Sequence, residues 1–434
     1  MTDSECAILG DLCNFTAGNA FKTKFQGNAT GDIPFIKVSD FELPENKYKI
    51  NHANNWISDE LALSERFKRH RAGGVVFAKI GVALTSNRRR ILSGDTIIDN
   101  NLMCATAKEN CCDPLFLYYL LSNLDFNLIS SGSAIPYLTV KDLREISVPY
   151  HSNADQKAIA HILGTLDDKI ELNRQMNETL EEIAKAIFKS WFVDFDPVRA
   201  KMEGRPTGLP DDIATLFPDR LVDSEIGEIS EGWAVGCVSE IAELNRKTLS
   251  PSKTGDLYEH FSIPAYDNDA SPSIDLGADI KSNKTVVPPE AVLVSKLNPD
   301  TPRVWLPRAA SDLDQICSTE FMVFTSKGLG SRSFVWSLFC AQSMIAYMKS
   351  LVTGTSKSHQ RVKPNDILAA KIVLSDSALI GAFSNVVDPI IKRRFVCSKE
   401  SETLADLRDT LLPKLIAGEL QVPDAEKFLE EAGI

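Results

Sequence analysis

Three residues in the first fifty have the types and spacing of a metal-dependent nuclease site. Asp32 is followed by Glu45 and Lys47, and the last two are separated by one residue. Two carboxylates can hold a divalent metal ion that activates water, and a lysine beside them can help to position that water. The pattern is short and common, and ordinary loop charges are the other interpretation. A metal-dependent nuclease using Asp32, Glu45 and Lys47 is therefore kept as an alternative hypothesis.

No other catalytic pattern is present in the sequence. It contains no phosphate-binding Gly-x-x-x-x-Gly-Lys-(Ser/Thr) loop, no complete dinucleotide fingerprint, no Gly-x-Ser-x-Gly elbow and no His-Glu-x-x-His motif. The (Asn/Asp)-Pro-Pro-(Tyr/Phe) motif of amino-methyltransferases is also absent. The 6 histidines have no ligand spacing, and the 9 scattered cysteines lack a Cys-x-x-Cys pair, which favours reduced core thiols. We therefore expect no catalytic residue, no metal site and no cofactor in this chain.

Two kinds of segment carry side chains suited to DNA binding. Basic residues cluster at 66–71 and at 88–90, and loops of Gly, Ser and Thr run over 131–137 and 353–361. Arg, Lys, Gln and Ser can bond base edges in the major groove, and Lys and Arg neutralise phosphates. A charge run alone usually marks a solvated face. The presence of a similar loop in both halves of the chain strengthens the DNA-binding interpretation.

Composition limits the class of protein. The 434 residues are 44% hydrophobic and 24% charged, with a formal net charge of -12, which is ordinary for a globular chain of two or three domains. The first residues lack the basic and apolar stretches of a signal peptide, and the longest apolar run, Leu115 to Leu121, is too short to cross a membrane. We therefore expect a cytoplasmic protein. The acidic balance argues against a protein that coats nucleic acid by bulk electrostatics.

An internal repeat organises the chain. The segment 155–170 is similar to the segment 377–391, and an offset of 221 positions matches Asp167 with Asp388 and Ile170 with Ile391. Upstream, the segments 101–103, 131–133 and 140–148 recur in the same order as 320–322, 353–355 and 362–373. Four ordered matches predict a tandem duplication.

Each half is predicted to be a strand-rich segment followed by a long helix. Apolar and β-branched runs predict strands at 33–38, 75–80, 96–98 and 146–148, and at 260–263, 291–296, 321–325 and 371–374. Amphipathic patterns predict helices at 114–128 and 332–350. The globular segments are therefore expected to be α+β.

Heptad spacing predicts a coiled coil. One seam runs from Asp155 to about Trp191, and a second runs from Phe383 to Leu415. Pro389 is expected to start or kink the second helix, and Pro413 to bend its end. Both seams are polar at their centres. Antiparallel pairing would bring Asn173 and Asn177 opposite 394–401 and would fix the register of the helices at a cost in stability.

The expected domain boundaries follow from these segments. They are 1–153 for a first recognition domain, 154–193 for the first long helix, 194–232 for an extended Pro/Gly-rich linker, 233–375 for a second recognition domain, 376–418 for the second long helix and 419–434 for an acidic C-terminal tail, which is expected to form a solvated helix.

Several motifs together carry a family resemblance. They are Gly74-Val-Val-Phe-Ala-Lys-Ile-Gly81, the Gly132-Ser133 loop followed by Leu138, Val140 and Leu143, Ser147-Val-Pro149, and, most distinctively, residues 155–174 running into Ser190-Trp-Phe-Val-Asp-Phe-Asp-Pro197. With these motifs, essentially the whole chain resembles the DNA specificity subunit of bacterial Type I restriction-modification systems.

The resemblance implies an α+β fold with two target-recognition domains, which two long antiparallel helices separate and an internal repeat relates by pseudo-two-fold symmetry. Each domain would read one half of a bipartite asymmetric site in double-stranded DNA. The helix pair would set the spacer length and dock two methyltransferase subunits, which methylate adenine N6, and through them restriction (motor-nuclease) subunits. S-adenosylmethionine, ATP and Mg would bind only in those partner subunits, in the cytoplasm of a bacterium or archaeon.

The resemblance and the loop chemistry together nominate residues for two roles. DNA contacts are expected from Lys79, Arg88, Arg89, Arg90, Ser131, Ser133, Tyr137, Lys141, Lys296, Thr355, Ser356, Lys357, His359 and Arg361. Helix packing or partner contact is expected from Ile159, Leu163, Leu166, Ile170, Leu180, Ile187, Trp191, Phe192, Phe195, Phe383, Val387, Leu404 and Leu411. Trp191, Phe192 and Phe195 would contact the methyltransferase or the second helix, and packing in the core of the chain itself is the other interpretation. Lys296 departs from the family pattern because the closing Gly, present as Gly81 in the first half, is missing.

The charge is unevenly divided along the chain. Residues 1–153 hold 16 Lys+Arg and 17 Asp+Glu, and residues 218–376 hold 16 and 20, so part of the acidity lies in the helices, linker and tail. This division predicts weak DNA binding by the chain without its partners. A coiled-coil adaptor that binds only protein is the remaining alternative.

Overall fold

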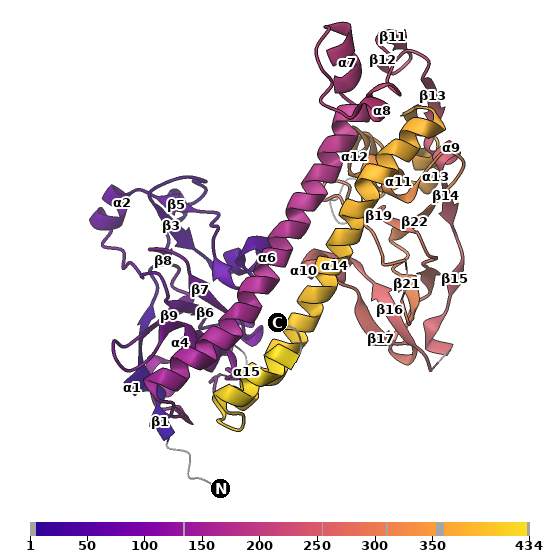
Figure 1. Ribbon diagram of the computed structural model, residues 1–434. Coiled ribbons are helices and arrows are strands. Elements are labelled where there is room, and N and C mark those ends of the chain that lie inside the picture. Colours follow the sequence, from indigo (N-terminus) through magenta and orange to yellow (C-terminus); the bar gives the residue numbers. More distant parts are fainter. Residues whose placement is uncertain (1–5, 133–134, 254, 310, 353–359, 432–434) are drawn as a thin grey trace. The chain divides into compact units, whose positions relative to one another are not determined.

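The computed structural model describes residues 6–132, 135–253, 255–309, 311–352 and 360–431. The chain forms two compact units (Figure 1). Unit 1 comprises Met1–Arg174 and Lys399–Ile434, and unit 2 comprises Gln175–Ser398. Each unit therefore contains one globular part and a portion of each of two long helices.

The globular part of unit 1 is built on two small sheets. Its strands are β1 (Cys6–Ile8), β2 (Cys13–Ala17), β3 (Ile33–Ile36), β4 (Lys49–Ile50), β5 (Trp56–Ile57), β6 (Val75–Ala78), β7 (Arg89–Leu92), β8 (Ile97–Ile98), β9 (Leu102–Ala107) and β10 (Ser147–Pro149). Its helices are α1 (Leu9–Leu12), η1 (Thr23–Phe25), η2 (Val38–Glu42), η3 (Pro44–Asn46), α2 (Asp59–Ser64), α3 (Val82–Thr85), α4 (Pro114–Ser122) and α5 (Val140–Arg144). The larger sheet has the order β2-β9-β6-β7-β4, and the smaller has the order β5-β3-β8.

Unit 2 also carries two main sheets. Its strands are β11 (Leu221–Ser224), β12 (Gly227–Ser230), β13 (Ala234–Cys237), β14 (Ala242–Asn245), β15 (Thr248–Leu249), β16 (Leu257–Phe261), β17 (Ser273–Leu276), β18 (Lys284–Val286), β19 (Val292–Ser295), β20 (Val304–Trp305), β21 (Asp314–Cys317), β22 (Phe321–Ser326) and β23 (Lys371–Leu374). Its shorter helices are α7 (Asp196–Met202), α8 (Asp211–Ala214), α9 (Val238–Ile241), η4 (Pro251–Lys253), α10 (Ile263–Asp269), η5 (Gly277–Asp279), α11 (Arg332–Cys340), α12 (Gln342–Ser350) and α13 (Pro364–Leu368).

The sheet topologies confirm the predicted duplication. The order β2-β9-β6-β7 in unit 1 is repeated as β14-β22-β19-β20 in unit 2. In the smaller sheets, β3 pairs antiparallel with β5 and parallel with β8, just as β16 pairs antiparallel with β17 and parallel with β21. The β1-β10 pair likewise matches β13-β23. The predicted α+β class is confirmed in both units, and all eight predicted strands overlap observed ones.

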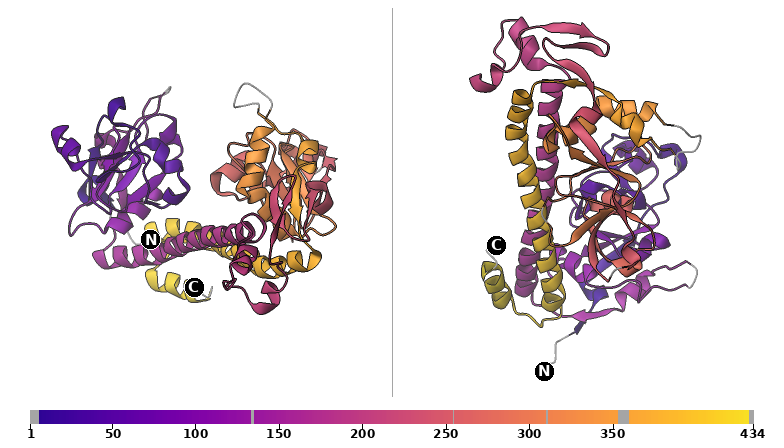
Figure 2. Two further views of the ribbon diagram at one scale, coloured as in Figure 1. Left: turned by 90° about the horizontal axis from the view of Figure 1, so that it is seen from above. Right: turned by 90° about the vertical axis from the view of Figure 1, so that its right-hand side faces the viewer.

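The two long helices are α6 (Asn153–Phe192) and α14 (Ser377–Ile416). Within each unit their segments lie side by side and antiparallel, as both views of Figure 2 show for the magenta and yellow helices. In unit 1, Asn173 Nδ2 donates to Glu400 Oε2 at 3.0 Å. In unit 2, Asn177 Nδ2 donates to Ser398 Oγ at 3.1 Å. The predicted meeting of the two polar centres is confirmed, and the described ranges hold no helix both long and apolar enough to cross a membrane.

The second long helix does not begin at Pro389, and one expected helix is divided in two. Pro389 neither starts nor ends α14, which runs through it and through Pro413. Pro389 is exposed, so its ring has solvent beside it, and the packed turns on both sides maintain the helix. The helix expected at 332–350 is two helices, α11 and α12, because the backbone at Ala341 is extended.

The segment 194–232 is not the extended linker that its composition suggested. It forms α7, α8 and the β11-β12 hairpin, and it buries Val198, Phe217 and Ile229 in the core of unit 2. The acidic tail forms a helix as predicted, but that helix is not fully solvated. It forms α15 (Val422–Glu431), whose Ala425 is buried and whose Leu429 packs on the core of unit 1. Apolar residues at helical spacing anchor a segment that is otherwise polar.

Candidate nucleic-acid interface

Lys79 is held where strand β6 ends in unit 1. Its backbone N–H donates to Asn101 O at 2.9 Å, and its carbonyl accepts from Leu138 N–H at 2.9 Å. One residue later, Ile80 forms a bridge with Tyr137. The side chain of Lys79 is half-buried, and among the described residues its ammonium group has no acidic partner. A lysine whose backbone is fixed and whose ammonium group has no acidic partner is suited to bind a DNA phosphate or a base edge.

The first recognition loop, Ser131–Tyr137, closes on itself. Ser131 and Tyr137 exchange two backbone hydrogen bonds of 2.9 Å. Gly132 has a φ of +92°, and a Cβ there would come within 2.5 Å of Ile135 O, so only glycine fits. Ser131 and Tyr137 are exposed, whereas Ser133 lies outside the described residues. Lys141 is also exposed, in the first turn of α5, which the Thr139 side chain caps.

Lys296 occupies the same backbone position in unit 2. Its N–H donates to Glu320 O at 2.9 Å, and its carbonyl accepts from Val362 N–H at 3.0 Å. Asn298 stands where unit 1 has Gly81, and both residues have positive φ, +49° and +77°. Asparagine tolerates this left-handed conformation better than most residues. The missing glycine therefore leaves the local path of the backbone intact.

Arg361 closes the second recognition loop, 353–361, beside Lys296. Leu297 forms a bridge with Arg361. The guanidinium group of Arg361 makes two hydrogen bonds to Glu320, Nε to Oε2 at 3.0 Å and Nη2 to Oε1 at 3.1 Å. Sequence reasoning missed Glu320, although the repeat aligns it with Asn101 at the same turn. The other nominated residues of this loop, Thr355, Ser356, Lys357 and His359, lie outside the described residues.

The prediction that Arg89 and Arg90 contact DNA is wrong in this structure. Both lie on β7, inside the larger sheet of unit 1, and their exposed fractions are 3% and 7%. Arg89 donates to Leu124 O at 2.7 Å and lies 3.7 Å from the ring centre of Phe126. Burial lowers the pKa of Arg89 to about 9. Both arginines are buried although they are adjacent on the strand, so both faces of the sheet are covered here and neither guanidinium group is accessible to DNA.

Arg88 keeps partial exposure but is already paired. Its guanidinium group contacts the carboxylate of Glu42. The hydrogen bond and charge of Arg88 lower the pKa of Glu42 below its ordinary value. A contact from Arg88 to DNA would therefore have to replace this ion pair.

The helix-packing residues are placed as nominated. In unit 1 the buried residues are Ile159, Leu163, Leu166, Leu404 and Leu411, and Ile170 packs against the same core. In unit 2 they are Trp191, Phe192, Phe195, Phe383 and Val387, and Ile187 packs against them. Leu180 is half-buried. The heptad seam thus continues into the globular core of each unit.

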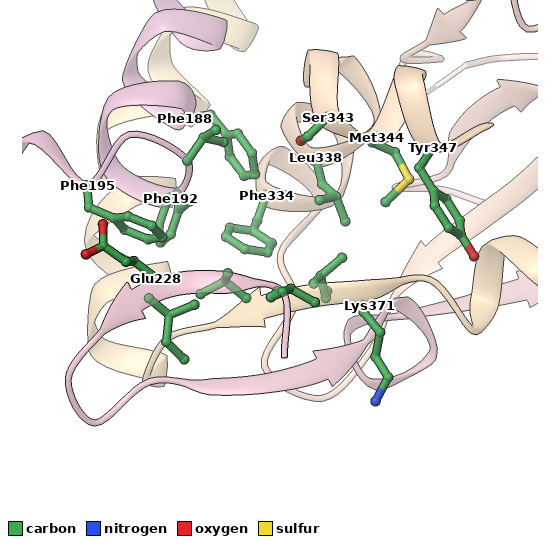
Figure 3. Close-up of a pocket in the computed structure, with 15 residues that line it drawn as sticks. Phe188, Phe192, Phe195, Glu228, Phe334, Leu338, Ser343, Met344, Tyr347 and Lys371 are labelled. Carbon is green, nitrogen blue, oxygen red and sulfur yellow. The ribbon is translucent and has the colours of Figure 1, made fainter. Parts of the chain in front are cut away.

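The aromatic end of α6 packs inside unit 2. The Phe192 ring centre lies 5.4 Å from that of Phe383 on α14 and 5.0 Å from that of Phe334 on α11. Trp191, Phe192 and Phe195 are at most 5% exposed. Of the surroundings expected for them, the second helix and the core of the chain itself are both observed. Beside them lies an apolar pocket of about 290 Å³, with Glu228 and Lys371 among its lining residues (Figure 3).

The residues of the nuclease hypothesis have ordinary structural surroundings. Asp32 Oδ2 accepts a hydrogen bond of 3.0 Å from the backbone N–H of Asp59 at the start of α2. The Glu45 carbonyl accepts from Asn51 Nδ2 at 3.3 Å, and Glu45 lies in the short helix η3. Across the described ranges, no group of three or more His, Cys, Asp or Glu side chains could hold a metal ion.

Comparisons with known proteins agree on one family. Residues 1–182 match the family described as the Type I restriction modification DNA specificity domain. The HindI specificity subunit of Haemophilus influenzae, a Type I restriction enzyme subunit, is 26% identical over 490 residues, covering 97% of this chain and 100% of the relative. The MjaIX specificity subunit of Methanocaldococcus jannaschii is 24% identical over 451 residues, covering 97% and 94%.

A solved structure has a similar fold. The S subunit of a Type-I restriction-modification system from M. genitalium matches with a TM-score of 0.52 and 12% identity, covering 96% of this chain and 97% of that one. The first 182 residues therefore match the Type I restriction modification DNA specificity domain, and 97% of the chain is similar to Type I restriction enzyme specificity subunits.

Proposed function

We propose that this chain is the non-catalytic subunit that gives a Type I methyltransferase and restriction complex its DNA sequence specificity. Each unit reads one half of a bipartite, asymmetric site in double-stranded DNA. The observation that carries the proposal is the repeated geometry around Lys79 and Lys296. In both units a lysine follows a buried strand, is fixed by two backbone hydrogen bonds and lies beside a recognition loop.

The long helices have a proposed role of their own. They set the number of base pairs between the half-sites, and they dock two methyltransferase subunits that methylate adenine N6. Large apolar side chains on outward faces of the helices support docking. Leu172 is 52% exposed in unit 1, and Ile183 and Val396 are 43% and 54% exposed in unit 2. In this proposal these three exposed apolar side chains contribute to the docking surface.

The chemistry belongs to partner subunits in this proposal. The methyltransferase subunits bind S-adenosylmethionine, and restriction subunits, which join through them, bind ATP and Mg²⁺. This chain contributes neither cofactor ligands nor reacting groups. The complex acts in the cytoplasm, where bacterial or archaeal DNA lies.

Mapping of methylated adenines tests the proposal. The full chain is expressed with its cognate methyltransferase subunit in a host that lacks adenine methylation, and the methylated sites are sequenced. We expect one bipartite site, and we expect exchange of residues 1–153 for those of a relative to change only one half of it. A simultaneous change in both halves would contradict separate recognition by the two units.

The same preparation distinguishes the alternatives. Cleavage of plasmid DNA by the purified chain with Mg²⁺, abolished by Glu45→Ala, would support the nuclease hypothesis. Failure of the chain and its methyltransferase together to retain any DNA sequence selectively would support an adaptor that binds only protein.

A further inference from the structure

Arg361 and Tyr137 occupy equivalent positions in the two units. Tyr137 bridges Ile80, the residue after Lys79, and Arg361 bridges Leu297, the residue after Lys296. The preceding carbonyls are also equivalent. Pro136 O accepts from Gly81 N–H at 2.8 Å, and Gln360 O accepts from Asn298 N–H at 2.9 Å. One backbone position, next to the lysine of each unit, therefore carries a tyrosine in unit 1 and an arginine in unit 2.

Glu320 fixes the orientation of Arg361. The carboxylate accepts from Nε and from one N–H of Nη2, with both distances near 3 Å. Of the five N–H donors of a guanidinium group, this pairing leaves three, two on Nη1 and one on Nη2. The side chain of Arg361 is 44% exposed, and among the described residues its guanidinium group has no further acceptor. The outer edge formed by Nη1 and Nη2 can thus donate two parallel hydrogen bonds to a ligand.

That outer edge matches one base better than the others. Guanine presents two acceptors, O6 and N7, on its major-groove edge, and a planar arginine can bond both at once. Adenine presents one acceptor and one donor there, so it cannot accept both hydrogen bonds. The carboxylate of Glu320 repels a phosphate group, which favours a neutral base edge over the DNA backbone at this place.

We propose that Arg361, held by Glu320, specifies a guanine in the half-site read by unit 2. The inference rests on the proposed function and adds a residue and a base to it. At the equivalent position of unit 1, Tyr137 is 42% exposed and has a single hydroxyl in place of paired donors. The two half-sites therefore differ at this position, and the guanine requirement belongs to one of them.

The test compares variants of the full chain, each expressed with the methyltransferase subunit as described above. The variants are Arg361→Gln, Glu320→Gln and, as a matched control, Arg303→Gln. Arg303 makes the same kind of two-bond pair, with Asp267, elsewhere in unit 2. Methylation is measured at sites carrying each of the four bases at every half-site position, and DNA affinity is measured over a range of salt concentrations.

We expect Arg361→Gln to lower discrimination for guanine at one position by roughly ten- to a hundredfold. The other half-site stays unchanged, which also shows that the complex has assembled. Glu320→Gln gives a smaller loss at the same position, and Arg303→Gln changes no base preference.

Three results would overturn the assignment. An unchanged site for Arg361→Gln would make the pair purely structural. A uniform loss across all sequences, with a weaker salt dependence, would make Arg361 a phosphate contact. A wild-type half-site for unit 2 without a G·C pair would exclude the guanine contact directly. If the wild-type complex methylates no bipartite site at all, the proposed function itself fails.

Discussion

At the residue scale, burial divides the basic side chains of unit 1 into two classes. Arg89 and Arg90 are within the sheet, where carbonyl groups and aromatic rings surround them. Lys79 is bound only through its backbone in the described part of the chain, so its charge is available to a ligand. Sequence position cannot separate these classes, because all of these residues are basic and close to glycine-containing loops.

Substitution of Lys79 should therefore affect DNA binding, whereas substitution of Arg89 should affect the stability of unit 1. Lys79→Gln is expected to weaken DNA binding by the assembled complex and to reduce the salt slope by about one, with stability unchanged within about 0.5 kcal/mol. Arg89→Met leaves the carbonyl of Leu124 with only the longer hydrogen bond of 3.4 Å from Asn87 Nδ2 and should destabilise unit 1 by about 1–3 kcal/mol. DNA titrations at several salt concentrations and urea unfolding measure the two effects. Equal loss of stability in both variants would contradict this division.

His70 makes the stability of unit 1 depend on pH. The residue is 4% exposed, and its Nε2 has no hydrogen-bond partner in the described structure. Burial, with a smaller contribution from Lys68, lowers the pKa of His70 from 6.5 to about 4. Between these values the unfolded chain binds a proton that the folded chain does not, so stability falls as the pH is lowered through this window.

The expected loss from His70 approaches about 3 kcal/mol near pH 4. Urea unfolding of unit 1 should show this loss in the wild type and a smaller one in His70→Gln. His161→Gln is the matched control, because His161 is exposed on α6. A wild-type pH dependence in His70→Gln would show that the loss arises from other groups.

At the element scale, the helix pair is polar at its centre and apolar toward both ends. In unit 1, buried Asp167 accepts from Tyr119 Oη at 2.7 Å and from Arg408 Nη1 at 2.6 Å, which ties α4, α6 and α14 together. In unit 2, aromatic rings connect the same two helices to α11. Each helix segment is therefore bound to a globular part as well as to the other helix, and this explains why α14 continues through Pro389.

Replacement of Pro389 should stabilise unit 2. Proline within a helix removes one backbone hydrogen bond and crowds the preceding turn. Pro389→Ala restores the bond at an exposed position, where no packing is lost. The expected gain is about 1–2 kcal/mol, less than the full helix penalty, because alanine also gives the unfolded chain more freedom. A lower melting temperature in this variant would show that Pro389 has a favourable role in shaping α14.

At the scale of the whole molecule, two similar units are joined by helices that belong to both. If these helices set the spacer in DNA, their length should control it. A heptad added to α6 after Arg174 and another added to α14 before Lys399 preserve the seam and lengthen each helix by about 10 Å. At about 3.4 Å per base pair, the preferred spacer should grow by about three base pairs.

Sequencing of methylated sites measures the spacer in this lengthened protein. We expect both half-site sequences to be unchanged and methylation to be less efficient, because three base pairs also rotate one half-site relative to the other by more than a quarter of a helical turn. A heptad added to α6 alone is the control and should disrupt pairing with α14. Efficient methylation at the original spacer would argue against the helices as the spacer element.

The sequence by itself determined the duplication, the α+β class, the strand positions and the long helices with their polar centres. These features depend on periodicity and on the order of similar segments, which are properties of the chain alone. The tertiary structure decided which of the nominated residues are available. It buried Arg89 and Arg90, paired Arg361 with Glu320, and anchored the segments 194–232 and 422–431 on the globular cores. Burial and pairing depend on residues distant in sequence, so local composition could not reveal them.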